Sequence, residues 1–350
     1  MQRPEPHAVS GRAVPIERGR ASTIRAVVCD RYGGPEVARL ADVPRPVIGA
    51  DQVLIDVRAS SICRGDIHLL NGKPYLIRIA GHGILRPKHP VPGQNVSGVV
   101  IEVASRVTGL APGDEVFGEI PHGAFAELVA ASAARLALKP ASFGHEDAAA
   151  LPVSGITALQ SLRDAGKLRA GQSVLINGAS GGVGTLAVQI AKALGADVTA
   201  VCGTRHLEAV RGLGADRVID YTREDFASAT LQHDVMLDLA GNRSLADCRR
   251  AVKPGGVLVA CGQLAGGTWL GPVPRLIKVA IAGRLSRCTM SPFLARPNSA
   301  DLQLLARMAD AGQLQPVVDK RFALAEIAQA LAHVAAGPVQ GTTVLAVAGA

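Results

Sequence analysis

The sequence predicts an α/β protein in which an irregular β domain accompanies a doubly wound parallel-sheet domain. Three observations lead to this prediction. Short strand-like runs broken by Pro and Gly fill the first part of the chain, strand-like and helix-like segments alternate in the middle part, and a glycine-rich loop joins one of those strands to the next helix. With 350 residues, the chain is long enough to bury two hydrophobic cores.

The composition excludes several classes of function. Hydrophobic residues make up 48% of the chain and charged residues 19%, which is typical of a folded protein. Aromatic residues, at 3%, are too few for a surface that stacks single-stranded nucleic acid. Beyond the N-terminus the net charge of +8 is spread thinly, so we expect a small-molecule substrate and no nucleic-acid partner. No apolar run approaches the length of about 20 residues that spans a bilayer, so we expect no membrane insertion.

The N-terminal segment and the cysteines bear on the compartment. Residues 1–23 contain several arginines and no apolar pattern, so we expect a flexible basic tail there. None of the six cysteines forms a C-x-x-C pair, and several lie in apolar runs such as IRAVVCD. Reduced, buried thiols are typical of a reducing compartment, so we expect a cytoplasmic protein.

The first domain is expected over residues 24–145. Strand-like runs occur there as QVLIDVRAS, VSGVVIEVAS and GAFAELVA, and the turn GLAPGDEVFG leads into another strand. The pattern then changes, because residues 142–166 (SFGHEDAAALPVSGITALQSLRDAG) have helical spacing. Ser142 is the expected N-cap of this helix.

Residues 146–299 are expected to form the parallel-sheet domain. Its predicted strands are SVLING, DVTAVCG, RVIDY, DVMLDLAG and GVLVACG. Helical segments such as GTLAVQIAKALG and RHLEAVRGLG lie between them, and this alternation indicates a parallel sheet with helices on both faces. Residues 271–297 show no clear pattern. Residues 300–350 contain two helical segments and a final strand, TTVLAVAG.

The strongest functional signal is the loop VLINGASGGVG, which carries the fingerprint Ala179-x-Gly181-x-x-Gly184 between a predicted strand and an amphipathic helix. Small residues let the backbone approach a pyrophosphate, and the free N–H groups and positive dipole of the helix N-terminus attract it. The loop therefore predicts a dinucleotide site.

The end of the second strand indicates which dinucleotide binds. An acidic residue about 20 positions after the glycines favours NAD, because it bonds the ribose hydroxyls. Here that position is near Gly203, and no acidic residue lies between Asp197 and Glu208. Thr204 and Arg205 follow instead, and a guanidinium suits a 2′-phosphate, so we predict NADPH over NADH.

The ordered set of motifs resembles the medium-chain dehydrogenase/reductase superfamily, most closely its zinc-free quinone oxidoreductase (zeta-crystallin-like) branch, which includes the reticulon-interacting oxidoreductases. The matching segments are GDIHLLNGKP, PGQNVSGVV, PGDEVFG, GAFAELV, AAALPVSGITALQSL, INGASGGVGTLAVQIAKALGA and GADRVIDYTREDF. The resemblance implies a GroES-like catalytic domain built from residues 24–145 and 300–350, with a Rossmann domain, residues 146–299, inserted between them. It also implies an active site in the cleft between the domains and a homodimer.

The resemblance raises the question of zinc. Zinc-bearing relatives join a C-x-x-D motif to a Gly-His-Glu segment and a later cysteine. This chain has Cys63-x-x-Asp66, but PGQN (92–95) replaces the histidine segment, and LPVSGITAL lacks the cysteine. A lone thiolate cannot hold catalytic zinc, which takes about three protein ligands, so we expect no metal. GHE does occur at residues 144–146, and we interpret it as capping and surface chemistry.

Cys63, Asp66 and His68 are the candidate catalytic residues, because the resemblance places polar active-site residues at these positions. On a strand Asp66 and His68 would share a face, whereas in a loop or helical turn they would not. His68 could donate a proton near neutral pH, and a packing or surface histidine is the alternative. We expect Asp66 to orient neighbouring groups or the cofactor ribose, and Cys63 to face the substrate or fill space.

The remaining candidates are cofactor contacts in the phosphate loop and after the carboxyl ends of the predicted strands, where ligands of parallel sheets bind. These candidates are Asn177, Ala179, Ser180, Gly181, Gly182, Val183, Gly184, Thr204, Arg205, Tyr221, Ala240, Gly241 and Gly262.

Together these observations predict a zinc-independent, NADPH-dependent oxidoreductase that transfers hydride to a quinone or an α,β-unsaturated carbonyl compound. Without a metal to polarise a carbonyl, a conjugated acceptor is the easier target, because its negative charge spreads onto a distant oxygen. Two other interpretations stay open: an enoyl-thioester or biosynthetic tailoring reductase, and a non-catalytic NADPH-binding protein.

Overall fold

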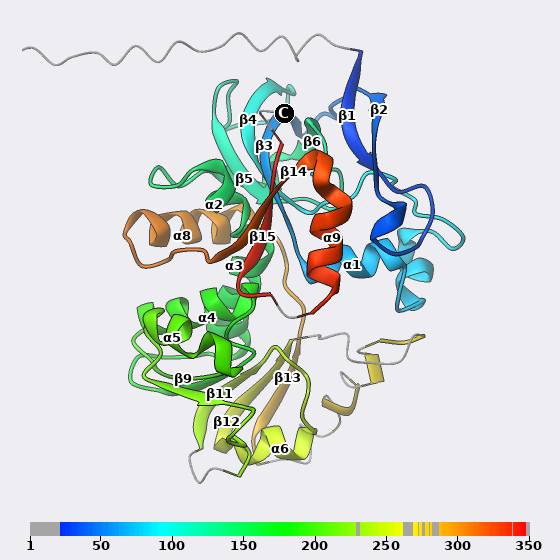
Figure 1. Cartoon of the computed structure of the whole chain (residues 1–350). Coiled ribbons are helices and arrows are strands. Elements are labelled where there is room, and N and C mark those ends of the chain that lie inside the picture. The colour runs from blue at the N-terminus through cyan, green and yellow to red at the C-terminus, as the bar shows by residue number, and fades with distance from the viewer. Residues whose placement is uncertain are drawn as a thin grey trace, which may run out of the picture.

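The computed structural model describes residues 22–228, 232–261, 269–271, 273–274, 277–279, 281, 287–337 and 339–347. Two β-sheets lie at opposite ends of the molecule, one in each domain (Figure 1). The predicted basic tail, apart from its last two residues, lies outside the described residues.

The catalytic domain contains a seven-stranded sheet and a separate antiparallel hairpin. The hairpin pairs β1 (Thr23–Val28) with β2 (Arg39–Pro44). The larger sheet has the order β14-β15-β3-β4-β5-β7, with β6 also paired to β3. Its strands are β3 (Gln52–Ile62), β4 (Asn95–Val103), β5 (Glu115–Glu119), β6 (Leu128–Ser132), β7 (Leu136–Leu138), β14 (Val318–Ala323) and β15 (Thr342–Ala346). Because β15 pairs antiparallel with β3, the C-terminal strand completes a sheet that the N-terminal half began.

The second sheet has six parallel strands in the order β10-β9-β8-β11-β12-β13. Its strands are β8 (Ser173–Asn177), β9 (Asp197–Cys202), β10 (Arg217–Asp220), β11 (His233–Asp238), β12 (Val252–Cys261) and β13 (Thr289–Phe293). The chain runs outward from β8 to β10 and then returns to β11 on the other side of β8. This reversal creates the switch point at which ligands of doubly wound sheets bind.

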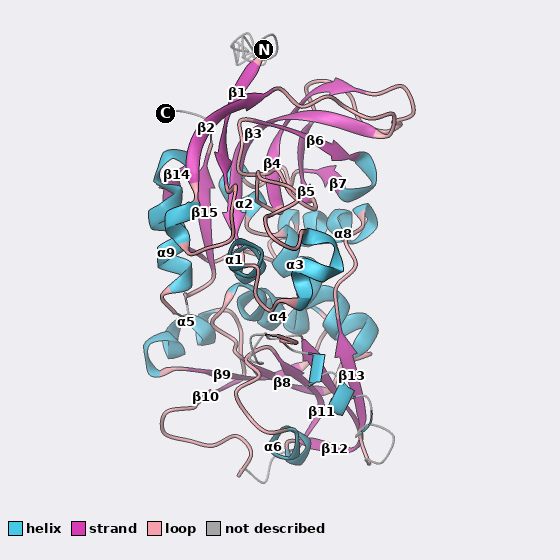
Figure 2. Cartoon of the chain, turned by 90° about the vertical axis from the view of Figure 1, so that its right-hand side faces the viewer, coloured by secondary structure: helices cyan, strands magenta, loops and turns pink. Residues whose placement is uncertain are grey.

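Helices cover both sheets and fill the boundary between the domains. They are α1 (Arg64–Asn71), α2 (His145–Ala149), α3 (Pro152–Gln160), α4 (Gly182–Ala193), α5 (Leu207–Gly212), α6 (Leu245–Arg250), α8 (Ser299–Asp310) and α9 (Ile327–Ala335). Figure 2 shows α1, α3 and α4 between the two sheets. In the Rossmann core, Leu186 and Ile190 of α4 are buried in one cluster with Val174 and Ile176 of β8, and each such side chain stabilises the fold by about 1.5–3 kcal/mol.

The single helix predicted over residues 142–166 is wrong. The segment contains two helices, α2 and α3, because Pro152 lacks an N–H group and begins a new helix. Ser142 is not an N-cap. Its amide and hydroxyl both donate to Asp310 Oδ1, at 3.0 Å and 2.9 Å, and Gly144 precedes α2.

Several elements were not predicted from the sequence, among them β14, α1 and β13. Helix α1 follows Cys63, and β13 lies within the segment that showed no clear pattern. Strand β13 contains Pro292 and forms the edge of its sheet, where a missing N–H group is tolerated. In the described ranges, no helix is long and apolar enough to cross a membrane.

A polar cluster joins α3 and the turn after it to α8. The carboxylate of Asp301 is buried, and it accepts hydrogen bonds from Gln160 Nε2 at 2.7 Å, Arg163 Nη1 at 2.7 Å and Asn298 Nδ2 at 2.8 Å. Asn298 in turn caps α8 by accepting from the amide of Asp301 at 2.8 Å.

We predict that Asp301→Ala lowers the stability of the protein by about 2 kcal/mol, because Gln160 and Arg163 then lose their buried acceptor. Thermal unfolding measures this change. Asp164→Ala is the matched control: Asp164 pairs with the same arginine but is exposed, so its loss changes stability by less than about 1 kcal/mol. Equal effects of the two variants contradict the prediction.

Candidate functional site

The phosphate loop joins β8 to α4, and its glycines set its shape. Gly178 has a φ of +93°, which favours glycine. A Cβ atom on Gly184 would lie 2.2 Å from the carbonyl oxygen of Gly178, so only glycine lets the first turn of α4 pack this closely on the end of β8. A Cβ atom on Gly181 would meet nothing closer than 3.8 Å, so this side of the loop leaves room for a pyrophosphate beside the helix N-terminus.

Other predicted loop residues lie around this turn in different roles. The side chain of Ala179 is fully buried, and its amide donates to the carbonyl of Val201 at 3.0 Å. This residue therefore attaches the loop to β9 and does not face a ligand with its side chain. Val183 lies in the first turn of α4 and is half-buried. The loop therefore offers a ligand backbone amides rather than charged side chains.

Two hydroxyl groups that the sequence analysis missed line the N-terminus of α4. A Cβ atom on Gly182 would lie 3.0 Å from Thr342 Oγ1 and 3.1 Å from Ser154 Oγ. The amide of Gly341 donates to the carbonyl of Ser180 at 2.8 Å, which fixes the start of β15 on the phosphate loop. Thr342 and Gly341 thus reach the phosphate end of the site from the C-terminal part of the chain, Ser154 reaches it from α3, and no local pattern in the sequence indicated these groups.

Polar groups meet at the carboxyl ends of β8 and β11. Asn177 Nδ2 donates to Asp238 Oδ1 at 2.9 Å and to Asn242 Oδ1 at 3.1 Å. The amide of Gly241 donates to the same Asp238 oxygen at 3.0 Å. These bonds hold the end of β11 beside the phosphate loop.

Ala240 lies beside the same loop, because a Cβ atom on Gly178 would be 3.3 Å from its amide nitrogen. Gly262, the candidate after β12, lies outside the described residues.

The carboxyl ends of β9 and β10 lie along the same edge of the parallel sheet, on the side of β8 opposite to β11. A Cβ atom on Gly203 would lie 3.3 Å from Tyr221 Oη, and Tyr221 is 48% exposed. Thr204 Oγ1 donates to Asp220 Oδ2 at 2.7 Å. Arg205 is exposed, and within the ranges the structure covers its guanidinium forms no ion pair.

Cys63 and Asp66 form the N-terminus of α1. The amide of Cys63 donates to Asp66 Oδ2 at 2.8 Å, so the aspartate caps the helix from inside its first turn. Residues two apart on a helix point in different directions, so Asp66 and His68 do not share a face as they would on a strand. Burial lowers the pKa of His68, which favours the neutral imidazole at neutral pH.

The residues at the positions of the zinc ligands do not fit zinc. The Cys63 thiol lies 3.5 Å from Gln94 Oε1, and Asn95 Oδ1 accepts from the amide of Val153 at 2.9 Å. Burial raises the pKa of Cys63 well above its ordinary value, which keeps the thiol protonated, and neither amide side chain is a zinc ligand of the usual kind. In the described part of the chain, no group of three or more His, Cys, Asp or Glu side chains is placed to hold a metal.

A buried carboxyl group beside this position was not predicted. Glu119 ends β5 and pairs in register with Asn95, and its Oε2 atom is buried without a hydrogen-bond partner. Asp66 Oδ1 is also buried without a hydrogen-bond partner. Burial raises the pKa of Asp66 to about 6 and that of Glu119 to about 7, with Asp66 adding to the effect on Glu119 and Arg135 opposing it.

The GHE segment does more than cap a helix. His145 Nδ1 lies 2.8 Å from Ser97 Oγ, and His145 Nε2 lies 3.1 Å from Glu115 Oε1. This order of groups resembles a hydrolytic triad, but Ser97 is fully buried and its hydroxyl donates to the carbonyl of Val116 at 3.1 Å. The three side chains therefore tie α2 to β4 and β5.

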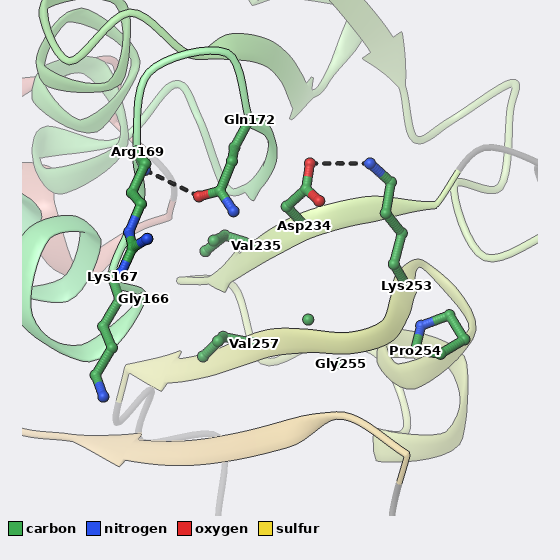
Figure 3. A pocket seen from close by; sticks show the side chains of 11 residues that line it. Gly166, Lys167, Arg169, Gln172, Asp234, Val235, Lys253, Pro254, Gly255 and Val257 are labelled. Carbon is green, nitrogen blue, oxygen red and sulfur yellow. Dashed lines mark hydrogen bonds and ion pairs between the residues drawn. The ribbon is translucent and has the colours of Figure 1, made fainter.

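A pocket of about 330 Å³ opens elsewhere on the Rossmann domain (Figure 3). It lies between the turn at residues 166–172 and the starts of β11 and β12, where Lys253 pairs with Asp234 at 2.9 Å. These are the amino ends of the parallel strands, opposite the edge that carries the phosphate loop. We therefore do not assign the cofactor to this pocket.

A phosphate loop at the switch point of a parallel sheet, covered by a second domain, defines a two-domain, dinucleotide-dependent oxidoreductase. Comparisons with known proteins agree. A family model described as an alcohol dehydrogenase GroES-like domain matches residues 49–141, and one described as a zinc-binding dehydrogenase matches residues 213–345.

Individual proteins match over nearly the whole chain. The mitochondrial NAD(P)H oxidoreductase RTN4IP1 of Mus musculus is 32% identical over 95% of this chain and 92% of its own length. The chloroplastic NADPH-dependent alkenal/one oxidoreductase of Arabidopsis thaliana is 32% identical over 92% of this chain and 79% of its own. The structure of the quinone oxidoreductase from Coxiella burnetii superposes with a TM-score of 0.80 at 30% identity, covering 93% of this chain and 99% of that one.

The chain therefore belongs to the medium-chain dehydrogenase/reductase superfamily, in its zinc-free quinone oxidoreductase branch. The predicted fold class, a GroES-like domain with a Rossmann parallel-sheet domain, is confirmed. So is the prediction of a nicotinamide-dependent oxidoreductase.

We predict that Gly184→Ala weakens cofactor binding at least about tenfold, because the added methyl group collides with the Gly178 carbonyl and displaces the start of α4. Fluorescence titration with NADPH and NADH measures the loss, which both cofactors share. Gly212→Ala on α5 is the control, because a Cβ atom there meets nothing within 4 Å. Unchanged affinity in Gly184→Ala contradicts this account of the loop.

We predict that Glu119 makes the protein less stable as the pH rises. Its folded-state pKa of about 7 lies above the ordinary value of 4.5, so the folded state binds the proton more tightly. This contribution is fully present below pH 4.5 and is lost as the pH rises through about 7.

Glu119→Gln should remove this pH-dependent loss of stability, which is at most about 3 kcal/mol. Melting curves recorded at a series of pH values measure the change. Glu115→Gln on the same strand is the control, because Glu115 is 54% exposed and pairs with Lys139 and His145. If stability falls with rising pH as steeply in Glu119→Gln as in the wild type, Glu119 does not cause the loss.

Proposed function

We propose that the protein is a zinc-independent, NADPH-dependent oxidoreductase that transfers hydride to a quinone or an α,β-unsaturated carbonyl compound. The observation that carries the proposal is that the chain combines a dinucleotide phosphate loop with zinc-ligand positions whose residues do not fit zinc. The names of the alkenal/one and quinone oxidoreductases among its relatives support the same substrate classes.

The chain's own groups suit this chemistry. A bound reduced nicotinamide supplies the hydride. The first turn of α4, with Ser154 and Thr342, holds the phosphates, and Asn177 keeps the end of β11 beside them. Because the residues around Cys63 do not fit zinc, we expect no Lewis-acid stabilisation of a carbonyl oxygen, so the acceptor must spread its own negative charge. Quinones and enones do so by conjugation.

We assign Cys63, Asp66 and His68 to the substrate side of the site. Asp66 acts as a positioning residue, because its hydrogen bond to the Cys63 amide fixes the start of α1. The protonated Cys63 thiol is a weak nucleophile, which argues against covalent catalysis by this residue. His68 remains the candidate proton donor, although burial disfavours its charged form.

We infer a preference for NADPH over NADH from the ends of β9 and β10. Gly203 occupies the position where an acidic residue would select the ribose hydroxyls of NADH. The nearby Asp220 accepts from Thr204, and from the amide and hydroxyl of Thr222 at 3.0 Å and 2.8 Å, so its oxygens are occupied. These hydrogen bonds lower the pKa of Asp220. Arg205 is the cation available to a 2′-phosphate.

We also propose a homodimer in the cytoplasm. The dimer rests on the family resemblance, and the compartment rests on six free cysteines, most of them buried. Light scattering of the purified protein tests the first, and fractionation of cells that produce it tests the second.

The function is tested by following NADPH oxidation with three acceptors: duroquinone, trans-2-hexenal and crotonyl-CoA. Turnover of duroquinone or hexenal supports the proposal. Turnover of crotonyl-CoA alone assigns the protein to enoyl-thioester reduction instead. Tight NADPH binding without turnover of any acceptor identifies a non-catalytic binding protein.

We predict that Arg205→Ala raises the KM for NADPH by about tenfold or more and changes the KM for NADH by less than about twofold, because only NADPH carries the phosphate that the guanidinium meets. Steady-state kinetics with both cofactors measures the difference. Arg211→Ala is the control, since Arg211 pairs with Glu208 on the surface of α5. Equal changes for NADPH and NADH in Arg205→Ala refute the assignment.

A further inference from the structure

The pocket of about 330 Å³ at the amino ends of β11 and β12 carries more positive than negative charge. Lys167, Arg169 and Lys253 line it, against the single carboxylate of Asp234. Figure 3 shows Lys167 and Arg169 on one side of the pocket and Lys253 on the other. The cations therefore face, from two sides, a space that is large enough for a small ligand.

The carboxylate of the pocket is already engaged, and it holds Lys253 in place. Asp234 Oδ2 accepts hydrogen bonds from the amide and the hydroxyl of Ser173, both at 2.8 Å, and from Lys253 Nζ at 2.9 Å. Burial raises the pKa of Asp234, but the hydrogen bonds from Ser173 and Lys253 outweigh burial and lower this pKa to about 2. The carboxylate is therefore ionised at neutral pH and compensates one of the three cations.

The other two cations have no counterion in the part of the chain that the structure describes. Lys167 and Arg169 are exposed, and within these ranges neither side chain forms an ion pair or a hydrogen bond. Like charges that line one pocket repel each other, and a bound anion relieves this repulsion. The cations exceed the carboxylate by two charges, and a phosphate group carries about −2 at neutral pH.

Lys167 adopts a backbone conformation that does not suit a lysine. Its φ is +51°, and among the described residues it is the only one other than glycine with a positive φ. The left-handed conformation is unfavourable for a residue with a Cβ atom and favours glycine. A lysine that served only to solubilise the surface would gain nothing from this position, so the strain points to a use for its ammonium group.

Gln172 adds an uncharged donor to the pocket. Its Oε1 atom accepts from the amide of Arg169 at 2.9 Å, which fixes the orientation of the side-chain amide. The Nε2 atom consequently points into the pocket, toward Val235 (Figure 3). The pocket therefore offers ammonium, guanidinium and amide N–H donors, and the oxygens of its lining side chains are already engaged. Such a set of groups suits an oxyanion.

We propose that this pocket is a second anion site, which binds the phosphate group of a small molecule. The inference does not rest on the proposed function, because the pocket lies at the edge of the sheet opposite the phosphate loop. The Arg169 guanidinium can donate to two phosphate oxygens at once, and Lys167 and Lys253 supply two further positive charges. A single carboxylate group would leave part of this charge uncompensated, so phosphate is the class of ligand that fits.

The first test measures anion binding while the phosphate loop is filled. The protein is saturated with NADP⁺ or NAD⁺, whichever binds more tightly, and pyrophosphate is titrated calorimetrically at constant ionic strength. One pyrophosphate should bind per chain, with an affinity about fivefold or more weaker in Arg169→Ala and in Lys167→Gly. Lys320→Ala is the control and should bind as the wild type does, because it removes an exposed cation from β14 of the other domain.

Two outcomes of this titration overturn the proposal. If the bound dinucleotide abolishes pyrophosphate binding, the anion had occupied the phosphate loop. If Lys320→Ala weakens binding as much as Arg169→Ala and Lys167→Gly do, the net charge of the protein attracts the anion and the pocket does not.

Thermal unfolding separates a ligand-binding role of Lys167 from a structural one. Lys167→Gly relieves the left-handed strain, so without pyrophosphate its melting temperature should not fall below that of the wild type. With the dinucleotide bound, pyrophosphate should raise the melting temperature of the wild type and of Lys320→Ala by mass action, and that of Lys167→Gly by less than half as much. A lower melting temperature of ligand-free Lys167→Gly, or an equal effect of pyrophosphate on all three proteins, overturns the proposal.

Discussion

The absence of a Cβ atom at Gly184 is the constraint on which the site depends. Because this glycine lies against the Gly178 carbonyl, α4 can start directly at the end of β8, and its free amides point to the switch point of the sheet. The same loop receives the start of β15 through the hydrogen bond from Gly341 to Ser180. This one tight turn therefore shapes the phosphate site and also holds the start of β15, a strand of the catalytic domain, against the loop.

The residues at the zinc-ligand positions show how the chain differs from zinc-bearing relatives. Cys63 retains the thiol, but its neighbour is the Gln94 amide, and Asn95 is engaged with the backbone of α3. Burial keeps the thiol protonated and raises the pKa values of Asp66 and Glu119, so this region carries less negative charge than its residue types suggest. Such an environment disfavours a bound cation and suits an acceptor that disperses its own charge.

The sequence predicted the features that depend on local pattern. The βα alternation and the glycine loop were recognisable because strand burial on both faces and a tight turn leave continuous apolar runs and adjacent glycines. Features that depend on tertiary contact were not predicted. Helix α1 is capped by a cysteine, which is not a usual N-cap residue, and Ser154 and Thr342 reach α4 from distant parts of the chain. The rings of Tyr75 and Trp269 lie 5.0 Å apart, centroid to centroid, although the two residues are far apart in the sequence, so no local spacing indicated this contact.

Metal content measured together with activity tests the central claim, that hydride reaches the acceptor in a cleft without zinc. The protein is dialysed against a chelator, its zinc is determined by elemental analysis, and NADPH-dependent quinone reduction is measured on the same sample. Full activity is expected with far less than one zinc ion per chain. Stoichiometric zinc whose removal abolishes activity and whose return restores it would contradict the account.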